Sequence, residues 1–143
     1  MASAITTVGL TSVLAETANN ELNFVEKDDS LKLTPPPNGV IPTAFVISPR
    51  WTVIDAMGPW EVFQDARTLK DSEGFDLFTV ADSLEPVTGS GGIKIAPNYT
   101  FENAPQPKVV VIGAQAGRSP AMFEWLKKVS ESADVIMSVC TGA

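Results

Sequence analysis

The chain contains a single cysteine, Cys140, which directly follows an apolar run and precedes Thr141 and Gly142. A cysteine at the turn from a buried strand into a helix exposes its thiol at the end of a sheet, where the thiolate can act as a nucleophile. Gly142 suits the tight turn that this geometry requires, and Thr141 offers a hydrogen bond to a substrate or to the sulfur. The alternatives are that Cys140 is a small buried core residue and that Thr141 only caps the next helix.

A carboxylate, Asp55, lies in VIDAMGPWEVF, residues 53–63, between an apolar stretch and the start of a predicted helix. An acid directed at the thiol can share a proton with the sulfur or move a water molecule during a reaction. An aspartate at this position can also serve simply as a helix N-cap or as a loop residue. The sequence leaves both interpretations open.

The stretch VVVIGAQAG, residues 109–117, places a loop of small residues directly after another apolar run. Glycine and alanine after a strand allow backbone N–H groups to point into a site, where they can bind an oxyanion. The same residues also suit an ordinary turn from a strand to a helix. GAQAG has neither the spacing of a GxGxxG motif nor the lysine of a P-loop, which argues against a nucleotide site.

The composition of the chain excludes several other kinds of chemistry. The 143 residues include no histidine, so His-ligated zinc and Ser–His or Cys–His catalytic pairs are ruled out within them. One cysteine permits neither an intrachain disulfide nor a multi-cysteine metal site. The net charge is −7 and the ten Lys and Arg residues are scattered, which argues against nucleic acid as a partner. No stretch reaches the roughly 18 apolar residues that a membrane-spanning helix needs.

Elements that position these groups follow from the pattern of apolar residues. Short runs rich in β-branched residues predict buried strands, and glycines between two such runs predict a hairpin. The predicted strands are residues 43–48, 75–80, 108–113 and 134–139, the hairpin is 85–97, and the predicted helices are 55–69 and 119–132. Pro59 suits the first turn of the first helix, and Ser119 is the candidate N-cap of the second.

This alternation of strands and helices predicts an α/β domain built on a largely parallel sheet. In such a sheet the carboxyl ends of the strands lie at one edge, where ligands and catalytic groups gather. Asp55, the GAQAG loop and Cys140 each follow a predicted strand. We therefore expect these three features to meet at that edge.

The N-terminal part of the chain differs in composition from the rest. Residues 1–15 are small and apolar and resemble the core and cleavage region of a signal peptide without its basic start. A clipped signal peptide predicts an exported, periplasmic protein, and an ordinary N-terminus predicts a cytoplasmic one. The polar residues up to 42 end in TPPPNGVIP, which predicts a proline-rich linker or arm, so that the folded domain begins near Thr43.

From Thr43 to Ala143 the motifs together resemble the DJ-1/PfpI (ThiJ-like) superfamily. The resemblance rests on the D-x-x-G-P-x-E-V-F signature, on the glycine loop after VVVI and on the cysteine elbow VCTGA. The signature residues are Asp55, Gly58, Pro59, Glu61, Val62 and Phe63. The chain looks most like the isocyanide hydratase branch, and it also resembles the class I glutamine amidotransferase-like domains of some transcription regulators.

This resemblance implies a flavodoxin-like three-layer sandwich with a mostly parallel sheet, a small-molecule substrate, and a homodimer or a completing chain. In the hydratase branch the elbow cysteine attacks the isocyanide carbon, and water converts the resulting thioimidate into an N-substituted formamide. Cys140 would be the nucleophile, Asp55 its acid and Thr141 a hydrogen-bond donor, with the backbone of Ala114, Gln115 and Thr141 stabilising negative charge. The resemblance implies no metal and no organic cofactor.

The family continues well past the elbow, so we expect residues 43–143 to correspond to the N-terminal part of its domain, truncated after the nucleophile elbow. The last strand would then present a partly uncovered apolar edge that invites pairing with another chain. Cys-Thr at the elbow, in place of Cys-His, argues against the peptidase-like branch. The alternatives to a lyase are a ligand-sensing or regulatory domain without catalysis, a redox-responsive thiol, and an inactive fragment.

Overall fold

A computed structural model of the chain describes residue 33, residues 36–37, residues 39–66 and residues 74–142. These residues belong to one compact unit, Lys32–Ala143. The predicted signal-like segment, most of the predicted linker and the predicted end of the first helix lie outside the described residues. None of the helices in the described residues is both long and apolar enough to cross a membrane.

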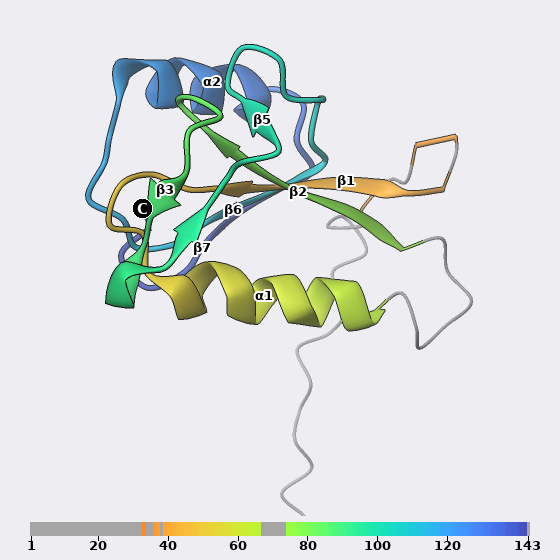
Figure 1. Ribbon diagram of the computed structural model, residues 1–143. Coiled ribbons are helices and arrows are strands. Elements are labelled where there is room, and N and C mark those ends of the chain that lie inside the picture. The colour runs from red at the N-terminus through yellow and green to blue at the C-terminus, as the bar shows by residue number, and fades with distance from the viewer. Residues whose placement is uncertain (1–32, 34–35, 38, 67–73, 143) are drawn as a thin grey trace, which may run out of the picture. The chain divides into compact units, whose positions relative to one another are not determined.

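A five-stranded parallel sheet forms the centre of this unit, with the strand order β5-β2-β1-β6-β7 (Figure 1). Its strands are β1 (Ile41–Val46), β2 (Phe75–Ala81), β5 (Tyr99–Thr100), β6 (Val109–Ile112) and β7 (Val135–Ser138). The predicted hairpin is a separate antiparallel pair, β3 (Val87–Thr88) and β4 (Lys94–Ile95), joined through a short 3-10 turn, Ser90–Gly92. The prediction of a largely parallel α/β sheet is confirmed.

Two helices cover opposite faces of the sheet, α1 (Val53–Ala66) on one side and α2 (Pro120–Ser130) on the other (Figure 1). Alternate residues of each strand point to opposite faces, so β6 contributes to two separate apolar clusters. Val110 and Ile112 pack in the cluster that contains Trp125 of α2, whereas Val109 and Val111 pack in the cluster that contains Ala56 of α1. Helix, sheet and helix form the three layers of a flavodoxin-like fold, as predicted.

Helix α2 forms as its sequence predicts. Ser119 is the N-cap, and its Oγ accepts a hydrogen bond from the backbone N–H of Met122 at 3.1 Å, satisfying one of the free donors of the first turn. Pro120 occupies the first helical position, where its missing N–H costs nothing. Met122, Trp125 and Val129 form the buried face of the helix. The helix ends at Ser130, two residues before the predicted end.

The start of helix α1 differs from its prediction. The helix begins at Val53 rather than at Asp55, so Pro59 lies in the helix interior and not in its first turn. The N–H of Val53 donates to Oγ of Ser90 at 3.1 Å, so the hairpin turn caps this helix. The prediction was wrong because the capping residue lies 37 positions away in the sequence and leaves no local signal.

Strand β1 also begins earlier than predicted, at Ile41, and it includes Pro42. A proline is tolerated at the beginning of a strand, because only its missing N–H is lost from the ladder. The carbonyl of Pro42 still accepts a hydrogen bond from the N–H of Lys108 at 2.8 Å, and the N–H of Ile41 donates to Gly74 at 3.0 Å. The prediction missed β5 altogether, because two residues are too few for a periodic pattern.

Candidate active site

The turn at Cys140 has a strained backbone. Cys140 follows β7, is exposed, and adopts a φ of 59°, in the left-handed region that residues with a side chain seldom occupy. The turn is closed by a hydrogen bond of 3.1 Å from the N–H of Gly142 to the carbonyl of Val139. Among the described residues, Cys140 is therefore not part of the buried core. Such conformations cluster at functional sites, where the surrounding structure holds them in place.

Gly142 packs directly against the end of β6. A Cβ atom at this position would lie 1.9 Å from the carbonyl oxygen of Ile112 and 3.0 Å from the carbonyl carbon of Gly113. The N–H of Val139 donates to the same oxygen of Ile112 at 2.9 Å. Only glycine allows this approach of backbone to backbone, so the elbow is held against the neighbouring strand end.

Gly113 also packs against Asp55, so that Asp55 lies near the cysteine turn. A Cβ atom on Gly113 would lie 2.8 Å from Cβ of Asp55 and 3.4 Å from its carbonyl carbon. Gly113 therefore touches the first turn of α1 as well as Gly142 of the elbow. The first turn of α1, the end of β6 and the turn after β7 thus meet around one glycine, which accounts for the proximity of Asp55 to the cysteine turn.

The carboxylate of Asp55 is buried, with 7% of the residue exposed, and it is held by the glycine loop. The backbone N–H of Ala114 donates to Oδ2 of Asp55 at 3.0 Å, and the N–H of Thr52 donates to the carbonyl of Ala114 at 2.8 Å. Two hydrogen bonds in opposite directions therefore join the start of α1 to the loop. This arrangement fixes one oxygen of the carboxylate at the carboxyl edge of the sheet.

The three predicted oxyanion donors do not have the same surroundings. The N–H of Ala114 is already occupied by Asp55, so it can bind another anion only after that hydrogen bond breaks. The backbone N–H groups of Gln115 and Thr141 form no hydrogen bond within the part of the chain that the structure describes. Stabilisation of negative charge by these groups stays a prediction, with Gln115 and Thr141 as the available donors.

Two side chains near this edge have features that the sequence did not signal. The amide nitrogen and oxygen of Gln115 are both buried and have no hydrogen-bond partner among the described residues. Ser48, which is 2% exposed, donates from Oγ to the carbonyl of Gly117 at 2.7 Å and ties the loop after β1 to the loop after β6. Neither role leaves a spacing pattern, because both depend on contacts between distant segments.

A pocket of about 280 Å³ opens at the ends of β1 and β2, and it is lined by Ser48, Asp82, Glu85 and Thr88 among others. The loop that joins β1 to α1 is anchored by Trp51, which is 2% exposed and packs against Gly89 of the hairpin turn. Among the described residues, no group of three or more Cys, Asp or Glu side chains has the arrangement of a metal site.

A parallel sheet with a helix layer on each face defines an α/β protein with a flavodoxin-like fold, and an exposed cysteine turn lies at the carboxyl edge of its sheet. Residues 43–143 match the model of the DJ-1/PfpI family. The match covers more than half of the chain, and the chain belongs to the DJ-1/PfpI family.

Relatives of known sequence or structure extend this comparison. The chain is 30% identical over 104 residues to the isonitrile hydratase of Pseudomonas putida, a match that covers 69% of this chain and 43% of that protein. The crystal structure of a ThiJ/PfpI family protein from Pseudomonas syringae is similar with a TM-score of 0.61 and 28% identity, covering 73% of this chain and 43% of the other. The chain thus spans less than half the length of these two relatives.

A putative transcriptional regulator from Vibrio parahaemolyticus has the same fold, with a TM-score of 0.61 and 17% identity over 71% of this chain and 57% of the other. At this identity the likeness concerns the fold alone. The fold therefore occurs in a protein described as a regulator as well as in one described as a hydratase, and it does not decide between these functions.

Proposed function

We propose that this protein performs cysteine-dependent hydration of a small carbon–nitrogen electrophile, with an isocyanide as substrate and an N-substituted formamide as product. The observation that carries the proposal is the contact of Gly113 with both Asp55 and Gly142, which places a buried carboxylate beside the exposed, strained turn of Cys140. The 30% identity to a protein named isonitrile hydratase supports the choice of substrate.

In the proposed reaction the sulfur of Cys140 forms a bond to the terminal carbon of the isocyanide, and the proton of the thiol is transferred to the same carbon through Asp55. The product of this step is a thioimidate, in which the cysteine is bound to a CH=N–R group. Water then adds to the carbon, the carbon–sulfur bond breaks, and the thiol recovers a proton. The sum is one isocyanide and one water consumed for each formamide released.

Asp55 suits the proton transfer because Ala114 holds one of its oxygens in a fixed direction. A protonated carboxyl accepts hydrogen bonds less strongly than a carboxylate, so protonation of Asp55 would weaken its hold on the N–H of Ala114. That N–H could then join those of Gln115 and Thr141 in binding the negative charge that develops on the substrate. The acid and the oxyanion donors would in this way act in sequence.

The proposal is tested by incubating the protein with an alkyl isocyanide and following loss of the isocyanide infrared band and gain of the formamide by mass spectrometry. We expect Cys140→Ala to abolish both turnover and covalent adduct formation. Asp55→Asn should lower the rate at least about 100-fold, the usual contribution of an acid or base. Asp76→Asn, a control at an exposed position on β2, should have no effect.

Turnover by the Cys140→Ala variant would overturn the mechanism. A wild-type protein that shows neither turnover nor a mass increase at Cys140 would overturn the function. Saturable, reversible binding of the isocyanide without any reaction would instead favour the second candidate, a ligand-sensing domain, for which the fold of the regulator from Vibrio parahaemolyticus provides the precedent.

A further inference from the structure

Ser48 presents a buried hydroxyl at the carboxyl edge of the sheet. This residue follows β1, is 2% exposed, and donates from Oγ to the carbonyl of Gly117 at 2.7 Å, across 69 positions of the sequence. A short hydrogen bond made by a buried hydroxyl fixes the direction of both partners. The bond joins the end of β1 to the glycine loop, residues 113–117, which carries the predicted oxyanion donor Gln115.

Gly117 lies where the last part of the glycine loop is attached to the loop after β1. The carbonyl of Pro49 accepts hydrogen bonds from the N–H groups of Ala116 at 3.2 Å and Gly117 at 3.1 Å. A Cβ atom on Gly117 would lie 2.6 Å from Cδ of Pro49 and 2.8 Å from Oγ of Ser48. Of the three hydrogen bonds that hold this part of the loop, only the bond from Ser48 comes from a side chain.

The other end of the glycine loop is attached independently. There Ala114 is joined to Thr52 and Asp55 by the two hydrogen bonds described above. Gln115 lies between the two attached ends, and its backbone N–H forms no hydrogen bond among the described residues. A donor that is held in place before the reaction stabilises developing charge without reorganisation. The direction of the Gln115 N–H therefore depends on the attachment of Gly117 as well as on that of Ala114.

The loop that carries Ser48 is itself fixed from the side of the hairpin. Arg50 has a φ of 64°, in the left-handed region, and its N–H donates to the carbonyl of Thr88 at 2.8 Å. The buried ring of Trp51 packs against Gly89. Strained residues persist where the surrounding contacts over-determine the backbone, so this loop has little freedom to move. Loss of the Ser48 hydroxyl would therefore loosen the glycine loop, because Ser48 itself stays in place.

We propose that Ser48 is a positioning residue, whose hydroxyl holds Gly117 and thereby directs the N–H of Gln115 at the negative charge that develops on the substrate. The role in catalysis rests on the function proposed above, whereas the hold on the loop can be measured without a substrate. A misaligned oxyanion donor weakens binding of the transition state, so kcat falls while KM changes little. A purely structural serine would lower stability and leave kcat per active site intact.

The first part of the test compares Ser48→Ala with a matched control, Ser130→Ala. Ser130 at the end of α2 also donates from Oγ to a backbone carbonyl at 2.7 Å, that of Lys127, but at an exposed position. In Ser48→Ala we expect the amides of Ala116 and Gly117 to exchange hydrogen at least about fivefold faster, since a buried carbonyl has lost its donor. In Ser130→Ala their exchange should equal that of the wild type.

The second part measures turnover of an alkyl isocyanide, with active sites counted by alkylation of Cys140. For Ser48→Ala we expect kcat per site to fall at least about tenfold while KM stays within about twofold. Gly117→Ala, whose added methyl group displaces the same hydroxyl from the other side, should lower kcat in the same way. Ser130→Ala should match the wild type in both constants.

Unchanged exchange of Ala116 and Gly117 in Ser48→Ala would overturn the proposal, whatever the reaction is. Faster exchange with an unchanged kcat would also overturn it, because the serine would then be purely structural. A wild-type protein that does not hydrate the isocyanide would overturn the proposed function and the catalytic role of Ser48 with it, whereas faster exchange would still establish that this hydroxyl holds the loop. Circular dichroism checks that each variant is folded, as expected when one hydrogen bond is lost from a domain.

Discussion

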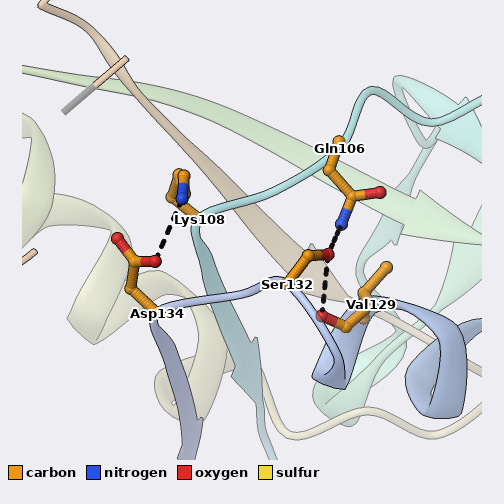
Figure 2. Close-up of polar contacts among 5 residues, drawn as sticks. All are labelled: Gln106, Lys108, Val129, Ser132 and Asp134. Carbon is orange, nitrogen blue, oxygen red and sulfur yellow. Dashed lines mark hydrogen bonds and ion pairs between the residues drawn. The ribbon is translucent and has the colours of Figure 1, made fainter. Parts of the chain in front are cut away.

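At the amino-terminal ends of β6 and β7, side chains meet each other at the surface, whereas at the carboxyl-terminal ends backbone packs against backbone. Figure 2 shows the first arrangement: Nζ of Lys108 pairs with Oδ1 of Asp134 at 3.0 Å, and Nε2 of Gln106 donates to Oγ of Ser132 at 2.6 Å. At the other end, Gly142 touches the carbonyl of Ile112 with no side chain between them.

The two ends therefore differ in their tolerance of change. Exposed polar side chains can be replaced with little effect, because water takes over their hydrogen bonds. Close backbone contacts leave no such alternative, since an added atom must displace a strand or a helix. The carboxyl end also holds the strained turn of Cys140 and the amide of Gln115, which has no hydrogen-bond partner among the described residues. Strain and unmet hydrogen bonding gather at the end that we propose to be functional.

A large effect is expected from Gly113→Ala at the carboxyl end. Its new methyl group would lie 2.8 Å from Cβ of Asp55, an atom that cannot rotate away. We expect the free energy of unfolding to fall by about 2–3 kcal/mol, the upper part of the range for overpacking. Urea denaturation followed by tryptophan fluorescence measures it. Labelling of Cys140 by iodoacetamide should change as well, because the elbow and α1 share this glycine.

The control for this prediction is the same substitution where there is room. At Gly58 in α1 the nearest atom to an added Cβ is Cδ1 of Ile54, at an ordinary 3.7 Å. Gly58→Ala should therefore raise the free energy of unfolding by up to about 1 kcal/mol through helix propensity. Equal losses at the two positions would contradict the claim that the carboxyl edge is distinguished by close packing.

Much of this fold follows from the sequence, because four of the five strands of the main sheet are largely apolar runs of four to seven residues and α2 has its N-cap next to it in the chain. What the sequence does not predict depends on distant contacts. Helix α1 begins at Val53 because Ser90 caps it from the hairpin, and Pro42 enters β1 because its carbonyl still bonds to Lys108. Both are tertiary effects that override local propensity.

The candidate site, like the fold, has features that the sequence predicts and features that it does not. Cys140 and Asp55 are recognisable from residue type and from their place after apolar runs. The attachment of Asp55 to Ala114 cannot be recognised in this way, because a hydrogen bond between two loops leaves no pattern in the sequence. The same is true of the buried amide of Gln115, which has no hydrogen-bond partner among the described residues. The sequence thus identifies the candidate reactive groups, and the structure adds how they are held.

An intermediate effect is expected from replacing the strained residue itself. Cys140→Gly and Cys140→Ala both remove the thiol, but only glycine adopts a φ near 59° without steric cost. The glycine variant should be more stable than the alanine variant by about 1 kcal/mol, the cost of a left-handed conformation for a residue with a Cβ atom. Thermal unfolding of the two variants side by side measures this difference. Equal stability would mean that the turn relaxes and that the elbow is not strained.

The smallest effect is expected at the amino-terminal end, from Lys108→Met. The ion pair of Lys108 with Asp134 is partly exposed, with 31% and 21% of the two side chains accessible to solvent. Pairs of this kind contribute about 0.5 kcal/mol or less, and salt screens them further. The loss should therefore be about 0.5 kcal/mol at most in low salt, and it should disappear in 1 M sodium chloride.

The physical reason for so small an effect is that the backbone, and not the ion pair, holds this end together. The carbonyl of Lys108 accepts hydrogen bonds from the N–H groups of Asp134 at 2.9 Å and Val135 at 3.1 Å, and its own N–H donates to Pro42 at 2.8 Å. None of these bonds needs the side chain that the substitution replaces. A loss above about 1 kcal/mol that persists in high salt would show that side chains at this end matter as much as the glycine contacts at the other.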